Sequence, residues 1–244
     1  MNVELRGVTR RYGKVPALDN VSLSVPAGSV VAVLGLNGAG KTTLLRCLSG
    51  VVAPERGDVL MDGQPLRRDD LALRRRLAFL PDFPLLFWER SVAHNLSVIV
   101  KLYEKDDASA PDRAIAVLRE LDMLPLANAP VRTLSRGQVH KTALAGLLLV
   151  DPELWLLDEP FSAGMDPLVL SYFRKAALEA VARGRTVVYT TQLLDVAERF
   201  ADRIAVLHEG RLRAWDGLDA LRRTAQDSAN PLEDLFRKLR GAPA

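Results

Sequence analysis

Disulfides and membrane-spanning runs are both missing from this sequence of 244 residues. Cysteine occurs once, at Cys47, which excludes an internal disulfide and a thiolate metal cluster and fits a reducing compartment. The longest apolar run, Ala143–Val150, is far shorter than the roughly 18 residues of a membrane span. The first residues carry no apolar signal region. We therefore expect a cytoplasmic protein that reaches a membrane only by docking on a membrane protein.

A strong charge of either sign is also lacking. Lysine and arginine number 33 against 30 acidic residues, so the formal net charge is only +3. That excess is too small to indicate a nucleic-acid partner. The arginine clusters at Arg67–Arg68 and Arg74–Arg76 are short enough to be solvated helix faces. Hydrophobic residues make up 48% of the chain, which is typical of a folded globular protein.

Short apolar runs alternate with amphipathic stretches, and this alternation predicts an α/β fold. Early β-type runs with turn signals predict antiparallel sheet that leads into an apolar core strand at Val30–Gly35. The middle of the chain has helical patterns, after which the β/α alternation returns. We expect a single domain: an α/β core with an antiparallel β subdomain at 1–83 and 151–218, an inserted helical subdomain at 84–150, and a helical tail at 219–244.

A glycine-rich stretch, GLNGAGKTT, lies between the core strand and a helix and fits the pattern G-x-x-x-x-G-K-[ST]. Its glycines let backbone N–H groups turn towards phosphate oxygens, and the helix N-terminus adds partial positive charge. Lys41 is expected to contact the β- and γ-phosphates, and Thr42 to ligate Mg²⁺. A glycine-rich turn without a ligand is the alternative, but the pattern arises by chance in only about one such chain in a hundred. The predicted phosphate loop comprises Gly35, Leu36, Asn37, Gly38, Ala39, Gly40, Lys41, Thr42 and Thr43.

A carboxylate pair follows a second apolar strand in the run LWLLDE. In isolation, two acidic residues after a strand are more often a turn or a helix start. Beside a phosphate loop they suit a nucleotide site, with Asp158 in the Mg²⁺ shell and Glu159 placed to orient or deprotonate a water.

Three ordered motifs together resemble the nucleotide-binding subunit of ATP-binding-cassette (ABC) transporters: the phosphate loop, LSRGQ at 134–138 and LLDEP at 156–160. The similarity spans nearly the whole chain and implies a P-loop NTPase core, ATP and Mg²⁺ as ligands, and ATP hydrolysis. In this family a signature motif closes over the γ-phosphate of ATP held by the other subunit of a head-to-tail dimer. Ser135, Gly137 and Gln138 match that motif, and donors at a helix N-terminus suit an anion.

The resemblance also implies roles for three other parts of the chain. Tyr12 matches the aromatic residue that stacks on adenine, although a strand aromatic packed on its sheet would look the same. Asp166 resembles an aspartate that couples the two sites, in a segment from Pro160 that is one residue longer than usual. The C-terminal PLEDLFRKLRG resembles the tail of cassettes that work with separate exporter-type permeases, as would any amphipathic helix.

The partners implied by the family are a transmembrane permease and a second ABC subunit, identical or homologous. The chain would then lie in the cytoplasm, on the inner face of the cell membrane. A regulatory or mechanical ATPase outside transport, and a nucleotide-binding module with little catalysis, are alternative functions. The chain has neither a second cassette nor a long coiled-coil insertion, which argues against the translation-factor and DNA-repair types.

Three residues depart from the family pattern. Arg136 stands where glycine is commonest in the signature and adds a positive charge near the phosphate. Asp82 replaces a glutamine that touches Mg²⁺ and links the ATP site to the permease, so we expect Asp82 to ligate the metal directly or through water. Gln192 replaces a histidine that reaches the γ-phosphate, and its amide can donate a hydrogen bond but carries no charge. We expect catalysis by Glu159 and Gln192, with slow turnover and intact ATP binding.

An aromatic cluster follows Asp82 in the run FPLLFWE. Phe83, Phe87 and Trp88 either fill the joint between the core and the helical subdomain or form a hydrophobic groove for a cytoplasmic helix of a permease. The sequence leaves both interpretations open.

Overall fold

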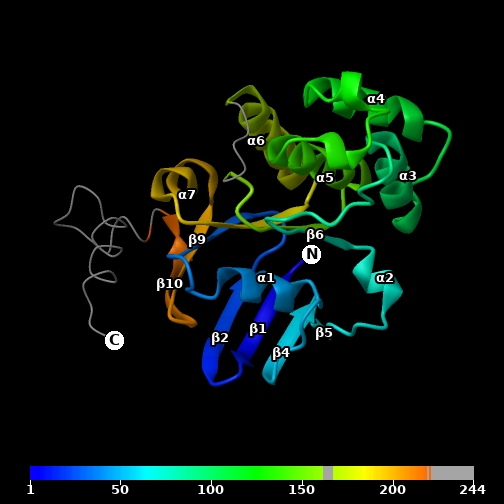
Figure 1. Cartoon of the computed structure of the whole chain (residues 1–244). Coiled ribbons are helices and arrows are strands. Elements are labelled where there is room, and N and C mark those ends of the chain that lie inside the picture. The colour runs from blue at the N-terminus through cyan, green and yellow to red at the C-terminus, as the bar shows by residue number, and fades with distance from the viewer. Residues whose placement is uncertain (162–166, 219, 221–244) are drawn as a thin grey trace.

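Two β-sheets and a group of helices make up the protein in a computed structural model that describes residues 1–161, 167–218 and 220 (Figure 1). A six-stranded core sheet runs through the middle, with the order β10-β9-β3-β8-β7-β6. The helices α3 to α7 lie on one face of this sheet, and α1 with a smaller antiparallel sheet lies on the other (Figure 1). The α/β fold with an antiparallel β subdomain, predicted from the sequence, is confirmed.

The core sheet is parallel except for its edge strand β10, which runs antiparallel to β9. Its central strands are buried throughout, as expected of strands covered on both faces. The strands are β3 (Val30–Leu34), β6 (Leu77–Leu80), β7 (Leu154–Leu157), β8 (Thr186–Thr191), β9 (Arg203–His208) and β10 (Arg211–Gly217).

Alternate residues of each core strand enter two separate hydrophobic cores. Val30, Ala32 and Leu34 of β3 pack towards the helical layer, whereas Val31 and Val33 pack towards the antiparallel sheet. This division follows from the two-residue period of a strand, which turns successive side chains to opposite faces. The helices of this layer are α3 (Val92–Leu102), α4 (Ala110–Glu120), α5 (Arg136–Val150), α6 (Pro167–Ala182) and α7 (Leu194–Phe200).

The antiparallel sheet has the order β2-β1-β4-β5, and α1 packs between it and the core sheet. Glycine at position 57 is required by the close approach of β4 to β1: a Cβ there would lie 2.2 Å from the carbonyl oxygen of Arg6. The elements are β1 (Val3–Tyr12), β2 (Val15–Val25), α1 (Lys41–Leu48), β4 (Arg56–Met61), β5 (Gln64–Pro65) and the short helix α2 (Leu71–Arg74).

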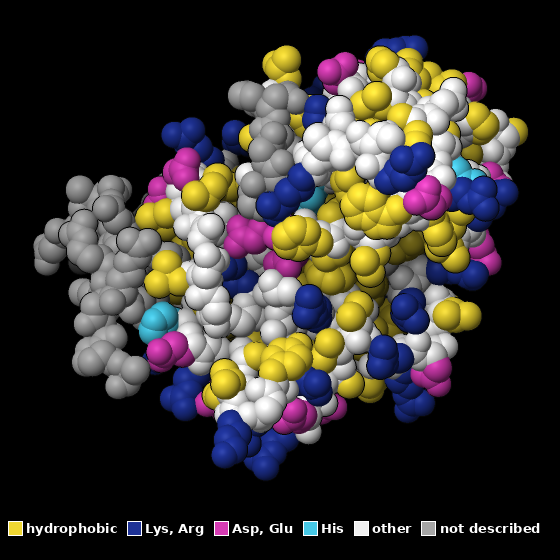
Figure 2. All heavy atoms as spheres, in the orientation of Figure 1, with side chains coloured by type: hydrophobic (Ala, Val, Ile, Leu, Met, Phe, Trp, Pro, Cys, Tyr) yellow, Lys and Arg dark blue, Asp and Glu magenta, His cyan; other side chains and the backbone are white. Residues whose placement is uncertain are grey.

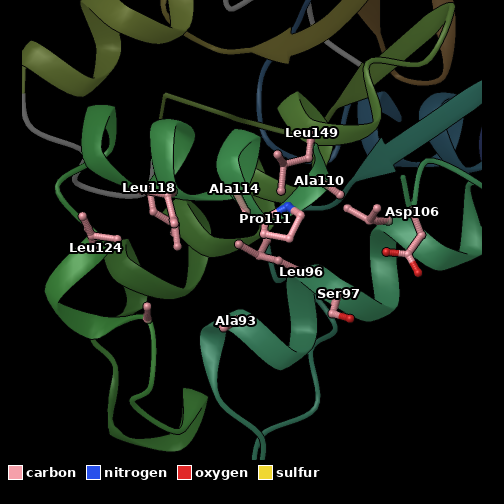
Figure 3. Close-up of a pocket in the computed structure, with 13 residues that line it drawn as sticks. Ala93, Leu96, Ser97, Asp106, Ala110, Pro111, Ala114, Leu118, Leu124 and Leu149 are labelled. Carbon is pink, nitrogen blue, oxygen red and sulfur yellow. The ribbon is translucent and has the colours of Figure 1, made fainter. Parts of the chain in front are cut away.

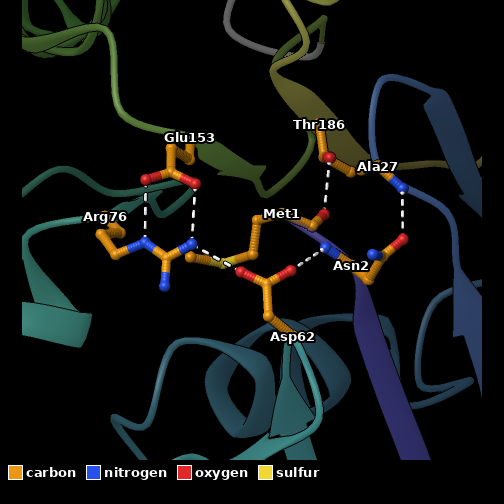
Figure 4. Close-up of polar contacts among 7 residues, drawn as sticks. All are labelled: Met1, Asn2, Ala27, Asp62, Arg76, Glu153 and Thr186. Atoms are coloured by element: carbon orange, nitrogen blue, oxygen red, sulfur yellow. Dashed lines mark hydrogen bonds and ion pairs between the residues drawn. The ribbon is translucent and has the colours of Figure 1, made fainter.

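A polar network joins the two sheets at the end opposite the phosphate loop (Figure 4). Arg76 binds Glu153 with two hydrogen bonds of 2.8 Å and also pairs with Asp62. The Asp62 carboxylate accepts a hydrogen bond from the backbone N–H of Asn2 at 2.8 Å, and the Thr186 hydroxyl donates to the carbonyl oxygen of Met1 at 2.8 Å. Bidentate arginine–carboxylate pairing fixes geometry as well as adding energy, so this network sets how the sheets sit together.

The helical part is built around α5. Helices α3 and α4 pack mainly against α5 and meet each other at few points. Where they face one another, mainly apolar side chains line a cavity of about 290 Å³ (Figure 3). Two 3₁₀ turns, Leu124–Leu126 and Val131–Thr133, lead from α4 into α5. The helices predicted for this region are present; the boundary of the subdomain at 84–150 stays a prediction.

Two predicted features lie outside the described residues: Asp166 and, apart from residue 220, the tail at 219–244 with PLEDLFRKLRG. Among the residues that are described, no helix is long and apolar enough to cross a membrane.

Cys47 offers a direct test of the packing around α1. Its side chain is 1% exposed, and burial raises the pKa of its thiol to about 11. Only the thiolate is reactive, and at pH 8 about one thiol in a thousand is ionised at that pKa. We expect iodoacetamide to alkylate the native chain at least roughly a hundredfold more slowly than the urea-unfolded chain. Intact-mass spectrometry measures this, since the chain has no other cysteine; equal rates would contradict the packing.

Candidate functional site

The predicted site residues gather at one edge of the core sheet. The phosphate loop follows β3, Asp158 follows β7, Gln192 follows β8, and Asp82 comes two residues after β6. These four strands are parallel, so their carboxyl ends meet at the same edge. Ligands of open α/β sheets bind at this edge.

The phosphate loop is held in place by close contacts with its surroundings. A Cβ at Gly35 would lie 2.6 Å from the carbonyl oxygen of Leu207, and one at Gly40 would lie 2.2 Å from that of Ala17. Gly40 also has φ of +102°, in the left-handed region that favours glycine. The loop therefore has a fixed path that only glycine permits at these positions, and its N–H groups are preorganised for an anion.

Lys41 connects the phosphate loop to Glu159, the predicted general base. The side chain is 6% exposed, and its Nζ donates to the carbonyl oxygens of Gly35 at 2.9 Å and Leu36 at 3.2 Å. The same Nζ lies 3.2 Å from Oε1 of Glu159. A buried ammonium must be paired or hydrogen-bonded, and here it has both kinds of partner. The structure thus brings together Lys41 and Glu159, which are 118 residues apart in the sequence.

Thr190 on β8 orders the carboxylate pair. Its hydroxyl donates to Oδ1 of Asp158 at 2.8 Å and accepts from the backbone N–H of Glu159 at 2.8 Å. Asp158 is 3% exposed, and Glu159 has φ of +48°, which is strained for a residue with a Cβ. Strained backbone of this kind clusters at functional sites. Sequence reasoning missed Thr190; a polar residue inside the apolar run TVVYTT is the signal that could have found it.

The residues present fit a metal ion that arrives with a nucleotide. Within residues 1–161, 167–218 and 220, no three His, Cys, Asp or Glu side chains are grouped so that they could hold a metal. Mg²⁺ characteristically takes one or two protein oxygens and shares its other positions with phosphates and water. Thr42, partly buried in the first turn of α1, and the buried Asp158 carboxylate are oxygens of that kind.

The signature residues start helix α5. Ser135 is the N-cap: its hydroxyl accepts from the N–H of Gln138 at 3.3 Å, and Oε1 of Gln138 accepts from the N–H of Ser135 at 2.9 Å. This capping box leaves Ser135 exposed at a helix N-terminus, with Gly137 in the first turn. The motif is thus presented on the surface of the chain, where a second molecule can reach it.

Asp82 and Arg136, two of the departures from the family pattern, contact each other. Nη2 of Arg136 donates to Oδ1 of Asp82 at 2.9 Å. The same guanidinium lies over the ring of Phe83, with 4.7 Å from Cζ to the ring centroid. The metal-ligand role predicted for Asp82 stays a prediction, because its carboxylate is bound to an arginine here.

Tyr12 and Gln192 are both open to solvent. Tyr12 ends β1 and is 45% exposed, with Cζ of Arg10 lying 5.3 Å from its ring centroid. Gln192 is exposed beyond the end of β8, before α7. An exposed ring and an exposed amide are available to a ligand, so these two predictions stand as proposals.

The loop after β6 exposes apolar side chains. Phe83, Leu85, Phe87 and Trp88 are each more than half exposed. On the face shown in Figure 2, hydrophobic side chains gather between the helices and the antiparallel sheet. The buried Asn95 side chain holds the loop: its Oδ1 accepts from the N–H of Phe87 at 2.7 Å. Exposure of this extent favours the groove interpretation over the filled joint.

The chain is similar to known ATP-binding proteins. Residues 18–162 match the protein-family model described as "ABC transporter". The daunorubicin resistance ATP-binding protein DrrA3 of Streptomyces coeruleorubidus is 36% identical over 220 residues, 90% of this chain and 69% of that protein. A solved ATP-binding subunit of an ABC transporter has a TM-score of 0.91 at 30% identity and covers 98% of this chain and 100% of that one. A dimeric ATP-binding cassette in a post-hydrolysis state, bound to ADP and Pi, has a TM-score of 0.79 at 27% identity, with coverages of 88% and 98%.

Proposed function

Since the chain belongs to the ABC transporter family, we propose that it binds and hydrolyses ATP and powers a membrane permease, as one subunit of a head-to-tail dimer around two ATP molecules. The observation that carries this proposal is the meeting of Lys41, Asp158 and Glu159 at the carboxyl edge of the core sheet. A buried cation in a glycine loop and two carboxylates in fixed positions are the parts that phosphoryl transfer to water needs.

Each residue of the site has a role that follows from its surroundings. The N–H groups of the phosphate loop and Lys41 would bind the β- and γ-phosphates, and Lys41 would exchange its carbonyl partners for phosphate oxygens. Glu159, held by Thr190 through its backbone, would orient the attacking water and accept its proton. Gln192 would donate its amide to the γ-phosphate, and Tyr12 would stack on adenine.

Mg²⁺, when bound with the nucleotide, supplies positive charge that offsets the charge on the phosphates. The Thr42 hydroxyl and the Asp158 carboxylate would hold it, and Thr190 would keep the Asp158 carboxylate in position through its hydrogen bond.

The dimer is supported by the exposed signature. Ser135, Gly137 and Gln138 stand at the N-terminus of α5, where the helix carries partial positive charge that favours an anion and Ser135 is exposed. The γ-phosphate of ATP on a second subunit, identical or homologous, fits this site. The similar cassette that is dimeric with ADP and Pi bound supports the formation of a dimer.

A permease is the partner that the exposed loop suits. Phe83, Leu85, Phe87 and Trp88 would receive an apolar cytoplasmic segment of the permease, which would hold the chain at the inner face of the membrane. An export direction is supported by a relative named Nod factor export ATP-binding protein I.

Replacing Lys41 tests nucleotide binding directly. We expect Lys41→Ala to weaken ATP binding by roughly ten- to a hundredfold, because it removes charge-assisted hydrogen bonds of about 1.5–3 kcal/mol. Isothermal titration calorimetry with the full chain measures this. Lys175→Ala is the matched control, since Lys175 is an exposed lysine on α6. The affinity of this variant for ATP should equal that of the wild type. Wild-type affinity in Lys41→Ala would exclude the proposed phosphate site.

A further inference from the structure

One face of α5 contacts two consecutive residues, Asp82 and Phe83, in the loop after β6. Arg136 binds the carboxylate of Asp82 at 2.9 Å and covers the Phe83 ring at 4.7 Å, within the range of a cation–π contact. Four residues further on, Nε2 of His140 makes a hydrogen bond of 2.9 Å with the carbonyl oxygen of Asp82. Residues four apart share a helix face, which is why a single helix can make all three contacts.

The three contacts differ in burial. His140 is 1% exposed and holds the backbone of the loop. The side chain of Arg136 is 54% exposed and that of Asp82 is 28% exposed. An ion pair this close to solvent adds little to the free energy of folding. The ion pair therefore matters more for the relative position of the elements that it joins than for stability.

Those elements carry the two halves of the proposed site. Asp82 lies at the carboxyl edge of the core sheet, where the chain would hold its own nucleotide. Arg136 lies between Ser135 and Gly137, which would face the nucleotide of the second subunit. Asp82 brings a negative charge that a glutamine lacks, and Arg136 brings the positive charge that balances it. The two departures from the family pattern are thus matched in space, although 54 residues separate them in sequence.

We propose that Asp82 and Arg136 form a latch between the nucleotide edge of the core sheet and the signature helix, in which Asp82 is a positioning residue for α5 and not a metal ligand. The inference rests on the proposed function, because it assigns the latch to communication between two nucleotide sites. The latch fixes Ser135 and Gly137 relative to the phosphate loop of the same chain. A movement that begins at one nucleotide is thereby passed to the residues that face the other.

Charge reversal in the full-length chain tests the latch. Asp82→Arg and Arg136→Asp each bring like charges together, and we expect either to lower ATP turnover about tenfold while ATP affinity of the phosphate loop stays unchanged. Hydrogen–deuterium exchange of the amides at 82–88 should become faster. The double variant restores opposite charges, so turnover and exchange should both return to within about threefold of the wild type. Thermal melting monitored by circular dichroism checks that every variant folds.

The ion pair of Arg132 with Glu89 provides a matched control. It joins the same region of the chain at 3.0 Å and is exposed on both sides. Arg132→Glu should leave turnover and the exchange of 82–88 at wild-type values.

A metal-ligand role for Asp82 gives a different pattern. Arg136→Asp would then keep wild-type ATP turnover, and the double variant would have turnover as low as that of Asp82→Arg. Either result overturns the latch. If the wild-type chain does not hydrolyse ATP, the proposed function fails. Hydrogen–deuterium exchange of the wild type, the single variants and the double variant then tests the latch without turnover. Exchange at 82–88 that returns to the wild-type rate in the double variant supports the latch, and exchange that stays fast overturns it.

Discussion

Glu159→Gln is expected to lower ATP turnover by a factor on the order of 10² to 10⁴, the usual contribution of a positioned general base. The backbone of Glu159 is held by its hydrogen bond to Thr190, and its carboxylate contacts Lys41. Glutamine has almost the same shape but cannot accept a proton from water. ATP binding should persist, and removal of one negative charge near the γ-phosphate should strengthen it. Release of inorganic phosphate by the full-length chain, alone and with a permease, measures the turnover.

Two outcomes bear on this prediction. Glu179→Gln is the matched control, because Glu179 is an exposed glutamate on α6 paired only with Lys175 among its described ion pairs, and it should keep wild-type turnover. Unchanged turnover in Glu159→Gln would remove the catalytic role of Glu159. A nucleotide-binding module with little catalysis would then be the better description of the chain.

Gln192→His is expected to raise ATP turnover by up to about a hundredfold, because a histidine is a stronger donor to a phosphate oxygen and can carry charge or a proton. Gln192 is exposed at the carboxyl edge of the core sheet, so a larger ring can be placed there without repacking. ATP affinity should stay the same, since the phosphate loop is untouched. The gain should also depend on pH and be larger below about pH 6.5, where a histidine introduced at position 192 carries a positive charge.

The matched variant at this position is Gln192→Ala, which removes the donor altogether and should lower turnover below that of the wild type. Equal turnover in the glutamine, histidine and alanine forms would show that position 192 does not contact the γ-phosphate.

Local patterns in the sequence account for much of the fold. The strands β3, β7 and β8 could be predicted because runs of apolar and β-branched residues are typical of a strand that is covered on both faces. The phosphate loop could be predicted from its glycine pattern. The pattern is informative because the backbone contacts at Gly35 and Gly40 leave no room for a Cβ. The carboxylate pair after β7 could be placed at the sheet edge by the same reasoning.

Contacts between distant segments could not be predicted in this way. β4 and α2 have weak apolar patterns, and tertiary packing decides their structure. The pairing of Lys41 with Glu159 and of Asp82 with Arg136 depends on how strands and helices are brought together in space. Each of these residues could be singled out by its motif, but nothing in the motif says which side chain it meets.

The central claim is that two chains enclose ATP between the phosphate loop of one and the signature of the other. Sedimentation velocity of Glu159→Gln tests it most directly, because slow hydrolysis keeps ATP intact during the run. We predict a dimer with ATP and Mg²⁺, a monomer with ADP, and a monomer under both conditions when Ser135→Arg blocks the N-terminus of α5. A dimer that forms equally well with Ser135→Arg would contradict the account. So would an ATP-bound Glu159→Gln chain that stays monomeric at high protein concentration, both alone and with a homologous subunit.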